Sequence, residues 1–291
     1  MSLNCTLPDH CQLAEGPNGL EVVRVANALG RAEIARNGAH VTSFAPRGAS
    51  EVLWLSERSA WSDGAPIRGG VPVCWPWFAA FGPAGGPAHG VARISQWDWV
   101  DAAALATGAT RLRFALAPSA TTRDWAPAAL RVELLVTVGS SLDIALRVHN
   151  PSTEPFTFAA ALHSYFTVGD ARQVWLTGLE GCHYEDRLLG QHLVQDGPVR
   201  FSAEADRIYA DQGEQVLIHD PVLERRISVR KRGSASTVVW NPWVAKSAFM
   251  PDFGDDEWPG MCCVETANVG DAAITLAPGG VHEMGVTIAL D

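Results

Sequence analysis

The sequence has no long apolar run. Nowhere in its 291 residues does an apolar stretch reach the ~18–20 residues that a membrane-spanning helix needs. The first residues, MSLNCTLPDHCQLAEG, also lack the basic start and the apolar stretch of a secretory signal. We therefore expect a protein that works in the cytoplasm and has no membrane partner.

Positive charge is scarce as well, with 22 Lys and Arg residues against 32 Asp and Glu and a formal net charge of −10. Nucleic-acid-binding surfaces are basic, yet the one basic cluster is ERRISVRKR at 224–232. Strand alternation places Arg226 and Arg230 on one face and Ile227 and Val229 on the other, as in a solvated strand. We expect no nucleic-acid partner. An anionic ligand would need its own cluster of arginines against this negative field.

Several motifs of metal binding and catalysis are missing. The six cysteines form no C-x-x-C pair, which gives no support to a zinc ribbon or a thioredoxin site and favours buried, reduced thiols. No G-x-G-x-x-G follows a strand, and no G-x-x-x-x-G-K-[ST], H-E-x-x-H or G-x-S-x-G occurs. A nicotinamide enzyme, a P-loop enzyme, a zinc protease and a serine hydrolase are therefore not indicated.

Long amphipathic helices are absent too, since PVLERR and AAALATG would give at most a turn or two. Short segments rich in β-branched and aromatic residues recur instead, and TVGSSLDI is typical of a hairpin. No repeat and no linker divides the chain. These features predict an all-β fold of stacked antiparallel sheets in one domain, with few short helices. The expected strands include LEVVRVAN, TRLRFALAP, LRVELLVTV, SLDIALRVHN, QVLIHD, RRISVRK, STVVWN, MCCVETA and VHEMGVTIAL.

Residues 65–99 break the strand pattern with a concentration of Gly, Pro and Trp. Loops of this composition are commonly functional, because glycine lets the backbone approach a ligand and aromatic faces suit the C–H faces of sugars. The segment carries Arg68, His89 and Arg93. Arginine suits bidentate binding of phosphate or carboxylate, although the residue type alone favours an ordinary surface position for each of these arginines over a ligand contact.

The segment PFTFAAALHSYFTVGD, residues 155–170, reads as one strand with a histidine in its middle. Alternation puts large apolar residues on one face, and His163 on the other beside Ala159 and Ala161. Small neighbours would leave room for a ligand, and an imidazole can exchange a proton near neutral pH. The alternative is a satisfied structural histidine.

Glu265 is the second candidate, in the strand MCCVETANV. Alternation places it on one face with Met261 and Cys263, where a carboxylate is costly unless it is paired or functional. The alternative is a strand end that lifts Glu265 into solvent. A glutamate and a histidine that face each other over a pocket would provide a proton acceptor and a proton donor.

Six blocks occur in this order along the chain: IRGGVPVCWPWF, PAHGVAR, ALHSYFTVGD, DRIY, VVWNPW and CVETANV. Together they resemble the glucose-6-phosphate 1-epimerase (D-hexose-6-phosphate mutarotase) family of the aldose 1-epimerase, or galactose mutarotase-like, superfamily. NGAHVTSFAP and EVLWLS are similar as well. The resemblance runs from about Gly19 to the C-terminus. It implies an N-terminal extension of residues 1–18, followed by a single antiparallel β-supersandwich over residues 19–291.

The resemblance also implies roles for individual residues. Glu265 would be the general base and His163 the general acid. A second site histidine would be His89. Departures from the family pattern are the extra alanines of WPWFAAFGP and an asparagine, Asn37, where glutamine is expected. Both concern loop shape, and the first leaves the geometry of the phosphate pocket open.

The remaining implied roles concern the substrate. Arg68 and Arg93 would bind a phosphate, and Asp206 would contact the sugar or support the site. Two arginines favour a hexose 6-phosphate, glucose 6-phosphate first, as the small-molecule partner. A mutarotase of unphosphorylated aldoses and a non-catalytic sugar-binding relative remain alternatives. The residues leave the oligomeric state open and are compatible with a monomer.

The implied chemistry needs no cofactor and no metal. Glu265 would take the proton of the C1 hydroxyl while His163 gives one to the ring oxygen. Ordinary pKa values of ~4.3 for Glu and ~6.5 for His leave the imidazole mostly neutral at pH 7. We therefore expect the pKa of His163 to be raised by Glu265 and by an anionic ligand, so that the ring stays protonated.

Overall fold

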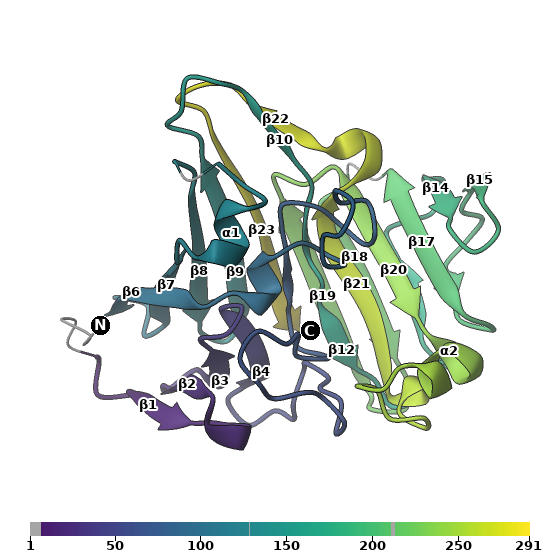
Figure 1. Ribbon diagram of the computed structural model, residues 1–291. Coiled ribbons are helices and arrows are strands. Elements are labelled where there is room, and N and C mark those ends of the chain that lie inside the picture. Colours follow the sequence, from purple (N-terminus) through teal and green to yellow (C-terminus); the bar gives the residue numbers. More distant parts are fainter. Residues whose placement is uncertain (1–6, 128, 211–212) are drawn as a thin grey trace.

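The computed structural model describes residues 7–127, 129–210 and 213–291. Strands dominate it, and every pairing between named strands is antiparallel. Two large curved sheets face each other, with a smaller sheet near the N-terminus at their edge (Figure 1). The prediction of an all-β fold built from antiparallel sheets is confirmed.

The larger sheet has nine strands and forms one wall of the sandwich. Its central hairpin is the one predicted from TVGSSLDI, with the turn at 139–141 between two eight-residue strands. In spatial order the strands are β16 (Val199–Arg200), β13 (Trp175–Thr177), β18 (Gln215–Asp220), β19 (Arg225–Arg232), β23 (Val281–Leu290), β9 (Leu142–His149), β8 (Arg131–Val138), β7 (Thr110–Leu116) and β6 (Trp97–Ala104).

The second sheet has eight strands and carries the candidate site. In spatial order the strands are β15 (Gln191–Val194), β14 (His183–Asp186), β17 (Ala205–Ala210), β20 (Ser236–Asn241), β21 (Met261–Asn268), β11 (Ala160–Leu162) and β5 (Val73–Cys74), with β12 (Tyr165–Thr167) also paired to β21. Strands β5, β14, β15 and β17 were not anticipated from the sequence. They are two to six residues long, which leaves little room for an alternating pattern.

Two small sheets complete the fold. A four-stranded sheet contains β1 (Cys11–Glu15), β2 (Glu21–Ala26), β3 (Gly30–Ala35) and β4 (His40–Pro46), and a two-stranded one pairs β10 (Phe156–Phe158) with β22 (Ile274–Leu276). Because β1 pairs with β2, part of the expected 1–18 extension lies in this sheet. Residues 1–6 lie outside the described residues, and the boundary at residue 19 stays a prediction.

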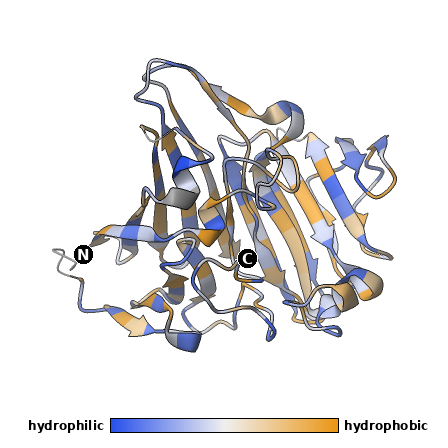
Figure 2. Ribbon diagram, viewed as in Figure 1, coloured by the Kyte–Doolittle hydropathy of each residue, from blue (hydrophilic) through white to orange (hydrophobic). Residues whose placement is uncertain are grey.

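The strands form where apolar residues recur at every second position. In β8, Val132, Leu134, Val136 and Val138 are buried, and the residues between them are partly exposed. Figure 2 shows the same alternation as changing colours along the strands of both sheets. One continuous apolar core joins the two large sheets to the four-stranded sheet, and this supports the prediction of one domain.

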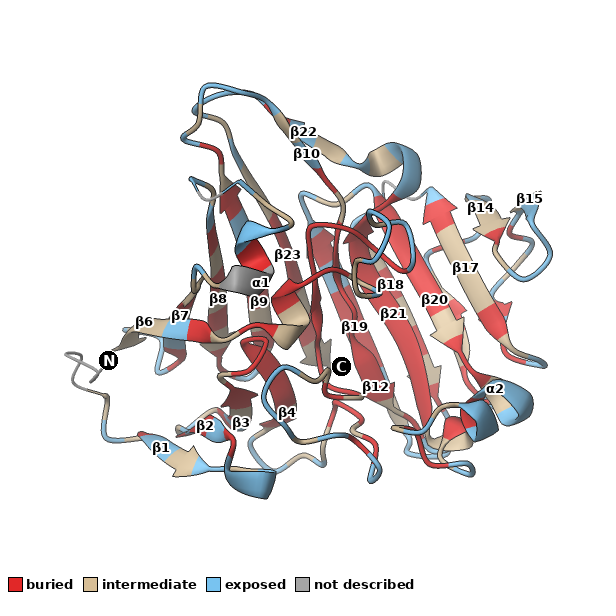
Figure 3. Cartoon of the chain, in the orientation of Figure 1, coloured by how far each residue is buried: buried red, intermediate tan, exposed pale blue. Residues whose placement is uncertain are grey.

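Strand β21 differs because all eight of its residues are buried (Figure 3). Cys262 and Val264 point into the main core, while Met261 and Cys263 join an aromatic cluster on the opposite face. The predicted alternation of MCCVETANV is therefore confirmed, with neither face open to solvent. The alternative in which a strand end lifts Glu265 into solvent is excluded, since Glu265 is 1% exposed.

The segment 155–170 is three short strands, β10, β11 and β12, so the prediction of one strand is wrong. The chain changes sheets between β10 and β11, because β10 pairs with β22 and β11 with β21. A hydrogen bond from Ser164 N to Leu162 O (2.9 Å) then closes a three-residue γ-turn centred on His163. This turn interrupts the ladder at the histidine.

The two alanines beside His163 have different surroundings. Ala161 is fully buried in a small cluster with Phe78 and Val238. Ala159 lines a separate cavity of about 600 Å³, whose lining includes Trp77 and Phe81. The expectation that both alanines leave room beside the imidazole is wrong, because the glycine-rich loop places Phe78 over Ala161.

Helices are short, as expected, although α2 (Trp243–Phe249) was not predicted. Its seven residues are too few to show a helical apolar period. Helix α1 (Ala120–Arg123) is shorter. The described residues also form the 3₁₀ turns η1 (Pro17–Gly19), η2 (Ala92–Ile94), η3 (Trp258–Gly260) and η4 (Gly270–Ala272). Within the described ranges, no helix has the length and apolar character to cross a membrane.

The cysteine prediction is largely confirmed. Cys11, Cys74, Cys262 and Cys263 are buried free thiols. Cys182 is half-buried, which differs from the expectation, and Cys5 lies outside the described residues.

Candidate active site

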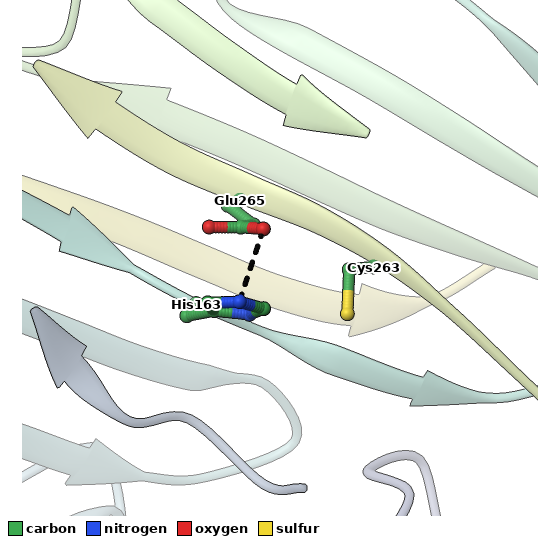
Figure 4. A group of neighbouring side chains, drawn as sticks. All are labelled: His163, Cys263 and Glu265. Carbon is green, nitrogen blue, oxygen red and sulfur yellow. Dashed lines mark ion pairs between the residues drawn. The ribbon is translucent and has the colours of Figure 1, made fainter. Parts of the chain in front are cut away.

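A carboxylate and an imidazole face each other beside the eight-stranded sheet. Glu265 projects from the middle of β21, and His163 projects from the γ-turn between β11 and β12 (Figure 4). His163 Nε2 lies 3.4 Å from Glu265 Oε1, with the side chains 8% and 1% exposed. The pair that the sequence predicted as proton donor and acceptor is thus brought together.

The outer atoms of this pair have no partner among the described residues. Glu265 Oε2 and His163 Nδ1 are both buried without a hydrogen bond. Buried polar atoms are nearly always hydrogen-bonded, and an unsatisfied one costs about 1–3 kcal/mol. The two groups that can exchange a proton therefore each have one atom free to meet a ligand.

Burial opposes charge on both members of the pair. Desolvation raises the pKa of Glu265 well above its ordinary value of 4.5, with a further contribution from Asp206. Desolvation, followed by the positive charges of Arg68 and Arg93, lowers the pKa of His163 well below 6.5. Both shifts favour the uncharged forms, in which a protonated Glu265 carboxyl and a neutral His163 imidazole hold one proton between them. The predicted protonation of His163 includes a bound anionic ligand, so it stays a prediction for the complex, and burial opposes it in the free protein.

This arrangement predicts a pH-dependent stability difference. The raised pKa of Glu265 means that native stability is lost as pH rises from about 4.5 through the folded-state value, because a buried carboxylate must ionise. The variant Glu265→Gln cannot ionise, so its melting temperature relative to the wild type should increase with pH. Thermal unfolding between about pH 5 and about pH 9 measures this. A constant difference across that range would contradict the raised pKa.

Aromatic rings hold the imidazole in place. The Tyr165 ring stacks on His163 with centroids 4.7 Å apart and planes 7° apart. Trp240, from β20, meets the same imidazole edge-on at 6.2 Å. The His163 ring therefore has a fixed orientation, and rings of this kind also suit the apolar face of a sugar.

Arg68 is connected to this stack but is already paired. Its Nη1 donates to Tyr165 Oη (2.9 Å), while Nε and Nη2 donate to the carboxylate of Asp252 (3.0–3.3 Å). The side chains of the ion pair are 18% and 19% exposed. Gly69 follows with a φ of 116°, and a Cβ there would collide with the Trp54 backbone, so the turn beside Arg68 requires glycine.

Arg93 is different because no carboxylate pairs with it in the described part of the chain. Its Nη2 donates to the Ala88 carbonyl (2.8 Å), and its Nε is buried without a partner. Desolvation lowers the pKa of this guanidinium, which is rare for an arginine. A half-buried guanidinium that lacks a carboxylate partner is a ready anion-binding group.

His89 lies on the loop side of the imidazole, as the resemblance implied. Its ring centroid is 5.4 Å from that of His163. The Ala79 N–H donates to His89 Nδ1 (3.4 Å), which leaves Nε2 as the protonated nitrogen. The His89 backbone has a φ of 64°, a strained value that typically occurs at functional positions.

Asp206 lies further away, on the same face. Asp206 pairs with Trp240 on β20, and Trp240 pairs with Cys263 on β21. Two strand spacings therefore separate the backbones of Asp206 and Cys263, roughly 10 Å across the sheet. The Asp206 carboxylate pairs with Arg187 (3.2 Å). Desolvation raises the pKa of Asp206. The structure thus brings His163, Glu265 and His89 into one cluster and places Asp206 at its edge.

A metal site is poorly supported here. His163, Cys263 and Glu265 bring three possible ligand atoms within 4.8 Å of one another. Desolvation raises the pKa of the Cys263 thiol well above 9.0. Because metals bind the thiolate, this donor set is unfavourable for a metal ion.

Three residues of the site were missed by sequence reasoning: Tyr165, Asp252 and Arg187. Tyr165 could have been found, since it shares a strand face with His163. Asp252 lies in a motif-free segment 184 residues from Arg68, and only the fold pairs them. Arg187 likewise carries no local signal.

Comparisons with known proteins cover most of the chain. The family model described as aldose 1-epimerase matches residues 21–289. A protein of Escherichia coli strain K12 named "Putative glucose-6-phosphate 1-epimerase" is 36% identical over 250 residues, covering 85% of this chain and 83% of that one. A protein of the same name from Cenchrus ciliaris is 34% identical over 279 residues, covering 92% and 84%.

The fold agrees as well. A crystal structure described as a "putative mutarotase" from Salmonella typhimurium superposes with a TM-score of 0.87 at 32% identity, covering 96% of each chain. The predicted mutarotase-like sandwich is thereby confirmed, as is the resemblance found in the sequence blocks. The chain belongs to the aldose 1-epimerase family.

Proposed function

We propose that this protein interconverts the α and β anomers of a hexose 6-phosphate, with glucose 6-phosphate as the preferred substrate. The observation that carries the proposal is the buried pair of Glu265 and His163 beside an unpaired guanidinium, Arg93. A neutral sugar has no negative charge to pair with that guanidinium, whereas a phosphate forms charge-assisted hydrogen bonds with it. The names of the Escherichia coli and Cenchrus ciliaris relatives support the same substrate.

The proposed reaction uses Glu265 and His163 as a base and an acid that exchange roles. Glu265 takes the proton of the C1 hydroxyl while His163 donates a proton to the ring oxygen, and the bond between C1 and that oxygen breaks. Rotation about C1–C2 turns the other face of the aldehyde toward the ring hydroxyl. Closure returns both protons, so each group is acid once and base once. The two groups lie 3.4 Å apart, so both can reach the C1 end of one bound sugar.

The phosphate would also redistribute the shared proton. In the free protein, Arg68 and Arg93 contribute to the lowered pKa of His163. A phosphate bound to these arginines offsets their charge, which raises the pKa of His163 and favours imidazolium beside carboxylate. Binding of the charged end would thus prepare the catalytic pair for ring opening.

A side-by-side assay separates the candidate substrates. Anomer exchange is followed by polarimetry on glucose 6-phosphate, glucose and galactose at equal concentrations. We expect kcat/KM to be roughly 10²-fold higher for glucose 6-phosphate, since charge-assisted hydrogen bonds contribute about 1.5–3 kcal/mol each. A preference for galactose would establish the alternative, a mutarotase of unphosphorylated aldoses.

We also infer that the enzyme works in the cytoplasm. A sugar phosphate is charged and does not cross the hydrocarbon core of a membrane, so its enzyme must be where the substrate is made. Cell fractionation tests this, and recovery of the protein outside the cytoplasm would refute it.

A further inference from the structure

The ion pair between Arg68 and Asp252 occupies the donor edge that a phosphate would use. Nε and Nη2 of a guanidinium form one flat edge that matches a carboxylate or a phosphate. Asp252 fills this edge with contacts of 3.0 to 3.3 Å. Tyr165 takes a further donor of Arg68 at Nη1. Arg68 therefore meets a ligand with most of its hydrogen-bonding capacity already used.

Asp252 is held firmly in this position. It lies in the segment that follows α2 (Figure 1), and the next residue, Phe253, is fully buried against Trp54 with ring centroids 4.8 Å apart. Gly254 N, one position further, donates to Glu257 Oε2 (2.9 Å). Because its neighbours are anchored, Asp252 cannot move away easily when an anion enters.

The formal charges show the consequence. A sugar phosphate carries roughly −1.5 to −2 charges at neutral pH. Arg68 and Arg93 together supply two positive charges, but Asp252 cancels one of them at close range. The three side chains thus carry a net charge of +1, whereas a net charge of +2 would balance the charge of the phosphate.

We propose that Asp252 is a specificity-determining residue that competes with the substrate phosphate for Arg68 and so weakens binding of the anionic end. This inference rests on the proposed function, because it takes the ligand to be a phosphate. If so, Arg93 makes the stronger contact with the phosphate, and Arg68 makes a weaker contact because it also binds Asp252. A site with two free arginines would retain a phosphorylated product, whereas this one releases it.

The test is the variant Asp252→Asn, with inorganic phosphate as the probe in titration calorimetry. Asparagine keeps the shape and one oxygen acceptor for Arg68, so it removes the charge while preserving the position of the guanidinium. We expect phosphate to bind roughly three- to thirtyfold more tightly than to the wild type. The KM for glucose 6-phosphate should fall in parallel. The variant Asp252→Ser removes the same charge and carries the same expectation if the asparagine variant does not fold.

The matched control is Asp255→Asn, three residues along the chain. Asp255 also pairs with an arginine, Arg58, but both side chains are more than half exposed. The Asp255→Asn variant should bind phosphate with the wild-type affinity. Unchanged or weaker phosphate binding by both Asp252 variants would overturn the proposed competition. A wild-type protein that exchanges the anomers of glucose as fast as those of glucose 6-phosphate would instead overturn the proposed substrate, so the two failures are distinguishable.

Discussion

Replacing Glu265 by glutamine should lower kcat for anomer exchange by roughly 10³-fold, within the range that one positioned proton-transfer group contributes. The amide has nearly the same size as the carboxylate, so the buried strand keeps its packing. It can neither accept the C1 hydroxyl proton nor share a proton with His163, which lies 3.4 Å away. Polarimetry or exchange spectroscopy on glucose 6-phosphate measures the loss.

The control for this variant is Glu283→Gln on β23, which removes a carboxylate paired with Arg147 at the surface. It should retain the wild-type rate. Binding of glucose 6-phosphate to Glu265→Gln, measured by calorimetry, should persist. Exchange at the wild-type rate in Glu265→Gln would remove the glutamate from the mechanism and favour the non-catalytic, sugar-binding alternative.

Replacing Arg93 by alanine should raise the KM for glucose 6-phosphate by roughly 10²-fold, because two or more charge-assisted hydrogen bonds to the phosphate are lost. The effect should be large since the Arg93 guanidinium is half-buried and has no carboxylate partner in the structure as described. For free glucose, which has no phosphate to bind, KM should change by less than about threefold. Steady-state kinetics on both substrates provides the comparison.

Arg58→Ala is the matched control, because Arg58 is an exposed arginine paired with Asp255. Its kinetics should equal those of the wild type on both substrates. Equal losses on glucose and glucose 6-phosphate in Arg93→Ala would mean that Arg93 supports the site as a whole, and the phosphate assignment would then be wrong.

Much of the scaffold could be predicted because strand alternation is a local property. The alternating burial of β8 and the two faces of β21 follow directly from their residues. The direction of Glu265 was predictable for the same reason, since it shares a face with Cys263. His163 was singled out from its own segment, and the family resemblance then implied that the two residues act as general base and general acid.

Other features depend on contacts that no local pattern encodes. The γ-turn at His163 arises where the chain changes partner strands, and Phe78 reaches Ala161 only because the glycine-rich loop folds back. The pairing of Arg68 with Asp252 joins segments 184 residues apart. The lowered pKa of His163 in the free protein has a related origin, because it is caused by burial and by arginines that the fold brings near.

Strand β21, which carries Glu265, has no residue exposed to solvent. For protein engineering this makes the strand a poor target, because a volume change at Cys262 or Val264 would move the carboxylate as well as loosen the interior. Libraries aimed at new sugars should spare it. They should instead vary residues 81–85, most of which are exposed, where new side chains can be introduced without changing the strand that carries the carboxylate.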